Sequence, residues 1–290
     1  MGPNDASHGS LLVGRDHELT ILRESLAAAL GGRGHLVLVS GEAGVGKTVL
    51  AEALCAEAEA RGALVLTGRC YALTETPPYD PWMQAAAQCA RSLALPAFPD
   101  ALHSNGQTAQ QFFAEVRDFF AAAAARRPLV LMFDDLQWAD RASLDLLRFF
   151  ARALSPLPIL VLAIYRPDDL TREHPLYPLL PLLVRESHAA RLDLDPLSRT
   201  ALADLVRRRY RLTAFDAERL VAYLARRTDG NALFVTELLH ALEEGGMVAP
   251  GEGRCTTWTR SACRRSCGRW WRGARRAWAR RQNGSSVSLP

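Results

Sequence analysis

The segment Gly41-Glu42-Ala43-Gly44-Val45-Gly46-Lys47-Thr48 places glycines, a lysine and a hydroxyl side chain at the spacing of a phosphate-binding loop. In such a loop the backbone N–H groups surround the α- and β-phosphates, and the lysine reaches the β- and γ-phosphates. Lys47 is the only lysine among 35 basic residues. A compact ammonium suits this position better than the planar guanidinium of arginine. The segment therefore predicts binding of ATP, with Lys47 as a catalytic residue.

The residues on either side predict the elements that such a loop joins. His35 to Ser40 form an apolar run typical of a buried strand, and Val49 to Leu54 favour a helix. We expect the residues from Gly41 to Val49 to hold the phosphates. The alternative is a glycine turn between two packed elements, with Lys47 in solvent.

A second group of side chains suits the same chemistry. Asp134 and Asp135 directly follow an apolar run, at the carboxyl end of an expected strand, where open α/β sheets bind ligands. By the pattern of P-loop NTPases, Asp134 and Thr48 should hold Mg²⁺, and Asp135 should orient the attacking water. The alternative is that both acids cap the next helix or face solvent.

Arg166 follows another expected strand and should emerge at the same edge of the sheet. A guanidinium there would contact the γ-phosphate and stabilise negative charge during phosphoryl transfer, which makes Arg166 a candidate catalytic residue. An ordinary surface ion pair with Asp168 or Asp169 is the alternative.

Apolar strands alternate with helices over the first two thirds of the chain, which predicts an α/β fold with a parallel sheet flanked by helices. The expected strands are 35–40, 63–67, 129–133, 157–165 and 189–194, and the expected helices are 16–30, 47–61, 82–94, 108–127 and 142–154. From 198 to about 244 only helical patterns remain. We therefore expect a P-loop core at 11–195 and a small helical lid at 196–248.

Composition bounds the class of protein. With 290 residues, 49% of them hydrophobic, the chain can bury one large core or two smaller ones. It has neither the apolar N-terminal segment of an exported protein nor a membrane-spanning stretch, so we expect a cytoplasmic protein without a membrane partner. Cys55, Cys70 and Cys89 stand singly and are typical of buried cysteines in a reducing compartment.

The net charge of +4 comes from the end of the chain. Residues 251–290 contain ten arginines and one acid, whereas the rest holds 25 basic and 30 acidic residues. We expect 1–10 to be disordered and 249–290 to have little order. The tail is either a basic, tryptophan-rich arm for nucleic acid or anionic surfaces, or the out-of-frame end of a GC-rich gene. The charge is therefore no argument for DNA binding by the folded part.

Three segments together resemble a known family: Leu12-Val13-Gly14-Arg15-Asp16-His17-Glu18-Leu19, Asp134-Asp135-Leu136-Gln137-Trp138-Ala139-Asp140 and Gly230-Asn231-Ala232-Leu233-Phe234-Val235. They are similar to the AAA-type ATPase domain of bacterial STAND signalling NTPases, which is found in large LuxR-type transcriptional regulators and in some adenylate-cyclase and kinase-associated proteins. The resemblance covers about residues 11–248 and implies an AAA+ fold with ATP and Mg²⁺ as cofactors.

By this resemblance Val13, Gly14 and Arg15 would lie near the adenine, and Arg166 would be the sensor arginine. The family usually has proline where this chain has Ala232, so the contact between the lid and the base is open. Val13 also has an alternative role as a packing residue.

The sequence thus predicts a slow ATPase that acts as a nucleotide-dependent switch and forms the ATPase module of a transcriptional regulator without its effector domain. Asp135 is one methylene shorter than the glutamate of many fast ATPases, which favours slow hydrolysis. The alternatives are an origin-recognition-like AAA+ ATPase associated with DNA and a nucleotide-binding scaffold that does not hydrolyse ATP. Self-association, with Arg148 or Arg152 reaching a neighbouring copy, is a further expectation.

Overall fold

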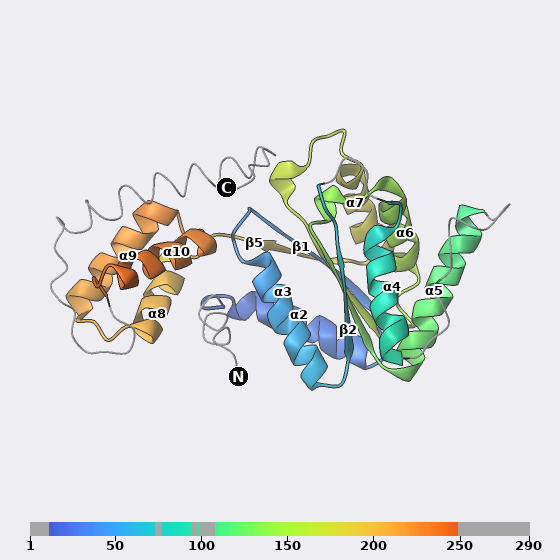
Figure 1. The fold of residues 1–290 in the computed structure, drawn as a ribbon, viewed down its shortest axis with the longest axis horizontal. Coiled ribbons are helices and arrows are strands. Elements are labelled where there is room, and N and C mark those ends of the chain that lie inside the picture. Colours follow the sequence, from blue (N-terminus) through green and yellow to red (C-terminus); the bar gives the residue numbers. More distant parts are fainter. Residues whose placement is uncertain (1–11, 73–76, 94–97, 99–107, 249–290) are drawn as a thin grey trace, which may run out of the picture. The chain divides into compact units, whose positions relative to one another are not determined.

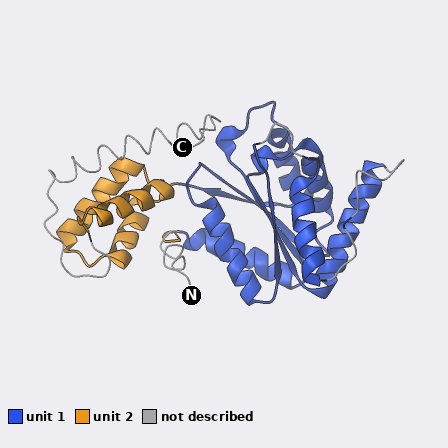
Figure 2. Cartoon of the chain, in the orientation of Figure 1, with its two compact units in different colours: residues 1–8, 15–195 blue, residues 9–14, 196–290 orange. Residues whose placement is uncertain are grey.

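The computed structural model describes residues 12–72, 77–93, 98 and 108–248. The expectations for 1–10 and 249–290 lie outside the described residues. The described chain divides into two compact units, one of residues 15–195 and one of residues 12–14 and 196–248 (Figure 2). In this division residues 12–14 belong to the helical unit, whereas the sequence analysis assigned them to the P-loop core at 11–195.

The first unit is built on a five-stranded sheet, which confirms the expected parallel sheet with helices around it (Figure 1). Its strands are β1 (His35–Gly41), β2 (Leu64–Arg69), β3 (Leu129–Asp134), β4 (Ile159–Ile164) and β5 (Ala190–Leu194). Their order is β2-β3-β4-β1-β5, and every neighbouring pair is parallel. β3 and β4 are buried along their whole length because helices cover both faces of the sheet.

Two helices pack on one face of this sheet, and the remaining helices of the unit cover the other. The first face carries α2 (Asp16–Leu30) and α3 (Lys47–Ala60). The opposite face carries α4 (Asp80–Leu93), α5 (Ala109–Arg126), α6 (Arg141–Arg152) and α7 (Leu176–Ser187). On that side Trp82 is fully buried, and its ring centroid lies 4.6 Å from that of Phe133 and 5.2 Å from that of Phe150.

α7 is the one helix of this unit that the sequence analysis did not predict. Its sequence contains Pro181, and a proline inside a helix removes a hydrogen-bond donor. Leu176, Leu179 and Leu183 nevertheless bury a stripe at helical spacing against the core. Tertiary packing therefore outweighs the unfavourable local sequence.

The second unit is a bundle of three helices, α8 (Arg199–Arg209), α9 (Ala214–Thr228) and α10 (Ala232–Glu244). Each helix begins after a polar residue whose side chain accepts a hydrogen bond from a backbone N–H of the first turn; these residues are Ser198, Thr213 and Asn231. Glu243 joins α10 to the end of α8, since it accepts hydrogen bonds from Arg209 at 2.7 and 3.0 Å and from the hydroxyl of Tyr210.

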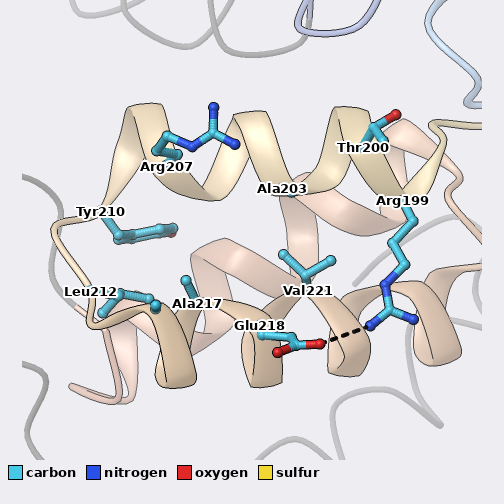
Figure 3. Close-up of a pocket in the computed structure, with 10 residues that line it drawn as sticks. Arg199, Thr200, Ala203, Arg207, Tyr210, Leu212, Ala217, Glu218 and Val221 are labelled. Carbon is cyan, nitrogen blue, oxygen red and sulfur yellow. Dashed lines mark ion pairs between the residues drawn. The ribbon is translucent and has the colours of Figure 1, made fainter.

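A surface pocket of about 610 Å³ lies between α8 and α9, within the second unit (Figure 3). Tyr210 and Leu212 line one end, and Arg199, which pairs with Glu218 at 3.7 Å, lies toward the other. None of these residues is a predicted site residue. Across the parts of the chain that the structure describes, no helix combines the length and apolar character needed to cross a bilayer.

Candidate functional site

The predicted phosphate loop joins the carboxyl end of β1 to the first residue of α3. Gly44 and Gly46 have φ values of 78° and 105°, in the left-handed region that favours glycine. This conformation turns the loop tightly over the N-terminus of α3, where backbone N–H groups without helical partners favour an anion. The local geometry is therefore suited to phosphate.

Lys47 is buried at the start of α3, with 7% of its surface exposed. Its Nζ donates to the carbonyl oxygens of Gly41 at 2.7 Å and Glu42 at 2.8 Å. Burial, and then the neighbouring charge of Arg166, lower the pKa of Lys47 to about 8. A bound phosphate would oppose both effects, so the site fits an anionic ligand.

Thr48 and Asp134 meet beside this lysine, on α3 and at the end of β3. The Thr48 hydroxyl donates to Asp134 Oδ2 at 3.1 Å, and the N–H of Asp135 donates to Asp134 Oδ1 at 2.9 Å. Burial, and then the charge of Asp135, raise the pKa of Asp134. A hydroxyl and a carboxylate are oxygen ligands of the kind that Mg²⁺ prefers, and a cation would offset the repulsion between the two acids.

Arg166 reaches the acids because β4 lies between β1 and β3 in the sheet. It follows β4 and forms an ion pair with Asp135, its nitrogen lying 3.1 Å from Oδ1. Its guanidinium also lies over the ring of Trp138, 5.2 Å from the centroid. The Arg166 side chain therefore forms its ion pair with Asp135. The alternative interpretation expected an ion pair with Asp168 or Asp169 instead.

The structure also places two residues here that the sequence analysis missed. Gln137, 2% exposed, contacts both Asp135 and Arg166, and His174 contacts the backbone of Gln137. Gln137 lies in the segment Asp134 to Asp140 that carries the family resemblance, two residues after Asp135, but that segment gave it no role of its own. No signal in the sequence pointed to His174, because it lies 37 residues further along the chain.

The segment predicted to lie near the adenine is divided between the two units. The Val13 side chain is buried in the apolar cluster of the helical unit, as the packing alternative expects. Arg15 is buried in the first unit, where it donates to the carbonyl oxygens of Val45 at 3.1 Å and Asp195 at 2.7 Å. Its guanidinium thus supports the phosphate loop. Adenine contacts by Val13, Gly14 and Arg15 stay predictions.

Two further groups from the sequence analysis have structural partners. Asp140 accepts a hydrogen bond from the N–H of Ser143 at 2.9 Å and so caps α6. Arg148 makes two hydrogen bonds with Glu186, at 3.0 and 2.8 Å, and Arg152 lies 3.8 Å from the same carboxylate. These pairs engage both arginines that were considered for a neighbouring copy.

Comparison with solved structures finds relatives of low sequence identity. A STAND protein with a tetratricopeptide repeat sensor from Pyrococcus horikoshii is 20% identical, with a TM-score of 0.49, over 77% of this chain and 29% of that one. Cdc6p from Pyrobaculum aerophilum is 17% identical, with a TM-score of 0.50, over 81% of this chain and 63% of that one. AMPPCP-bound DnaA from Aquifex aeolicus is 14% identical, with a TM-score of 0.49, over 95% of this chain and 71% of that one.

These identities establish likeness of fold alone, and the chain spans less than two thirds of the STAND protein and of Cdc6p. A comparison with curated proteins finds no match. The model of the AAA ATPase domain matches residues 11–162, a range that includes the phosphate loop and the acidic pair. With that match and the parallel sheet around the loop, the chain belongs to the AAA ATPase domain family.

Proposed function

We propose that this chain is the ATP- and Mg²⁺-binding ATPase module of a STAND-type signalling protein in the cytoplasm. Hydrolysis is slow, and the bound nucleotide acts as a conformational switch. One observation carries the proposal: Lys47, the Thr48–Asp134 pair and the Asp135–Arg166 pair meet at one edge of the sheet. The three sequence segments that resemble STAND proteins support the choice within the AAA family.

In this proposal the loop N–H groups and Lys47 hold the phosphates, and Thr48 and Asp134 hold Mg²⁺. The metal, when bound, neutralises charge on the β- and γ-phosphate oxygens. Asp135 accepts a hydrogen bond from the attacking water and orients it, and Arg166 stabilises charge on the transferred phosphoryl group.

Two features of Asp135 favour slow hydrolysis. Its side chain is one methylene shorter than glutamate, and its Oδ1 already accepts a hydrogen bond from Gln137 and forms an ion pair with Arg166. Release of Asp135 from Arg166 would then precede hydrolysis. We expect a turnover below about one per second, the lower end of the range for enzymes.

The test compares Lys47→Ala with Asp135→Asn in the full chain. Lys47→Ala should lose ATP binding, measured by calorimetry, because the loop loses its buried cation. Asp135→Asn should keep the ATP dissociation constant within about threefold and lose turnover at least about 100-fold. Unchanged turnover in Asp135→Asn would support a non-hydrolysing scaffold instead.

The proposal also covers the process that the ATPase module controls. We propose that the module serves a transcriptional regulator whose effector domain lies in a longer protein or a partner. The origin-recognition-like alternative makes a different prediction, because it requires DNA binding. Titration of labelled duplex DNA with the ATP-bound chain should give no complex at near-physiological salt, and a submicromolar dissociation constant would favour that alternative.

A further inference from the structure

Gln137 is a buried polar side chain that the proposed function does not use. It lies in the 3₁₀ turn Leu136–Trp138, directly after the acidic pair, with 2% of its surface exposed. Its Nε2 donates to Asp135 Oδ1 at 2.9 Å, and its Oε1 accepts from the N–H of Arg166 at 3.0 Å. A buried amide is costly unless both ends are hydrogen-bonded, so these partners fix its orientation.

The amide therefore links the ends of two neighbouring strands. Asp135 follows β3 and Arg166 follows β4, and both are proposed to act on the same phosphate. Asp135 has φ 55° and ψ 44°, a left-handed conformation that is uncommon outside glycine, although aspartate adopts it more readily than most residues. Gln137 contacts the carboxylate of this residue directly.

His174 holds the turn from the other side. Its Nε2 lies 2.7 Å from the carbonyl oxygen of Gln137, and its Nδ1 accepts from the N–H of Leu176 at 3.2 Å. Because a carbonyl oxygen only accepts, Nε2 carries the hydrogen and Nδ1 has the free lone pair. Both ring nitrogens of this tautomer are thus used to keep Gln137 in place.

We propose that Gln137 is a positioning residue for hydrolysis: its amide holds the Asp135 carboxylate at the angle at which it orients the attacking water, relative to Arg166. This inference rests on the proposed role of Asp135. Since Gln137 acts through another side chain, its loss should lower the rate of hydrolysis without weakening nucleotide binding.

Gln88 offers a matched control in the same unit. It is also a glutamine with two amide hydrogen bonds, to the N–H of Thr67 at 3.0 Å and to its carbonyl oxygen at 2.7 Å, at the edge strand β2. Gln137→Met and Gln88→Met each remove both bonds. Gln137→Glu and Gln88→Glu keep the shape of the side chain and replace the donor by an oxygen.

Single-turnover hydrolysis and ATP affinity are measured for these four variants of the full chain, with thermal unfolding as the check of folding. Gln137→Met should lower the hydrolysis rate at least about tenfold, with the ATP dissociation constant within about twofold. Gln88→Met should lower stability and leave the rate unchanged. Unchanged hydrolysis in folded Gln137→Met would overturn the proposal.

Gln137→Glu gives a second readout and decides the case if Gln137→Met does not fold. The glutamate side chain keeps the length of glutamine but has no N–H to donate to the Asp135 carboxylate, so the hydrolysis rate should fall at least about tenfold while the ATP dissociation constant stays within about twofold. Gln88→Glu should leave the rate unchanged. A wild-type rate in folded Gln137→Glu would contradict a contact with the reacting carboxylate.

Asp135→Asn separates this inference from the proposed function. If Asp135→Asn retains wild-type turnover, the proposed function itself is wrong. If Asp135→Asn loses turnover while both Gln137 variants retain it, only the positioning role is wrong. In the double variant with Asp135→Asn, Gln137→Met should cause no further loss of rate.

Discussion

At the scale of single residues, the site places a like charge beside each of two buried groups. Burial, and then the charge of Arg166, lower the pKa of Lys47, while burial, and then the charge of Asp135, raise the pKa of Asp134. Such pairs destabilise a protein without ligand and are typical of sites that bind charged ligands. Two predictions follow from the direction of the pKa shifts.

ATP affinity should depend on the protonation of Lys47. The ammonium form binds phosphate, and in the free protein the Lys47 pKa is about 8. The dissociation constant should therefore be constant below about pH 7.5 and rise by up to about tenfold per pH unit above pH 8. Calorimetry at pH 7, 8 and 9 measures this, and binding above pH 8 should take up protons.

Arg166→Gln is the control for the cause of this shift. Burial is the main cause of the lowered Lys47 pKa and the charge of Arg166 is the second, so removing the guanidinium should raise this pKa. The pH at which ATP affinity begins to fall should then be higher. The effect on stability has the opposite sign: between pH 8 and 10.5 the unfolded chain binds more protons than the folded protein, so Lys47 destabilises the fold less as pH rises. A flat affinity profile up to pH 10 would contradict the assignment.

Asp134→Asn should stabilise the nucleotide-free protein and abolish its response to Mg²⁺. Burial and the charge of Asp135 raise the Asp134 pKa, so the ionised form is disfavoured in the folded state. Its removal should therefore raise the free energy of unfolding at pH 7, measured by urea unfolding. A less stable variant would show that the hydrogen bonds from Thr48 and the Asp135 N–H outweigh the charge effect.

The sequence predicted the residues of the site that belong to a local pattern. Lys47 and Thr48 follow from loop spacing, and Asp134 and Asp135 from their position after an apolar strand. Gln137 and His174 could not be given roles this way, because the contact of Gln137 with Arg166 spans 29 residues of chain and that of His174 with Gln137 spans 37. Nothing in a single sequence shows that two strands will be neighbours in a sheet.

At the scale of elements, the exposed edge of β2 is satisfied by side chains of α4. Gln88 pairs with both backbone groups of Thr67, and Gln84 accepts from the N–H of Arg69 and donates to its carbonyl oxygen, each at 3.0 Å. The two amides thus form the hydrogen bonds that a neighbouring strand would form. They occupy backbone groups that could otherwise pair with a strand of another chain.

Gln88→Leu should cost more stability than Gln84→Leu. The Thr67 backbone is partly buried, so water cannot fully replace the lost amide, whereas Arg69 is exposed. We expect losses of about 1–2 kcal/mol for Gln88→Leu and below about 1 kcal/mol for Gln84→Leu in urea unfolding. Equal losses would contradict the importance of burial at this edge.

Four of the five strands were predictable because each contains a short apolar run, and the structure moves their ends by only a few residues. The fifth, β5, alternates charged and apolar residues, with Leu192 and Leu194 buried. α7 was not predictable, because Pro181 opposes a helix and only contacts with distant residues of the core reveal its buried face. The glutamine cover of β2 was equally hidden, since nothing in its local sequence identifies β2 as an edge strand.

At the scale of the whole molecule, the chain has two units, and a nucleotide switch requires that one responds to ligand in the other. Buried Arg15 contacts the phosphate loop at Val45 and the last residue of the first unit, Asp195. The basic residues of 251–290 lie outside the described structure. Their charge therefore adds nothing to the account of the ATPase site.

Bound nucleotide should change the hydrodynamic size or the assembly of the full chain. Sedimentation velocity with Mg²⁺-ATP and with Mg²⁺-ADP should give different sedimentation coefficients, because a switch requires two states with different ligand affinity. Lys47→Ala should show one value under both conditions. Identical values for the wild type with both nucleotides would argue against a switch of this kind.

The most direct test of the central claim is phosphate release by the full chain at saturating ATP, with Mg²⁺ and with excess EDTA. The account predicts release that is slower than about one per second, depends on Mg²⁺ and falls to background in Asp135→Asn. Release that persists in EDTA, or that Asp135→Asn leaves unchanged, would contradict it.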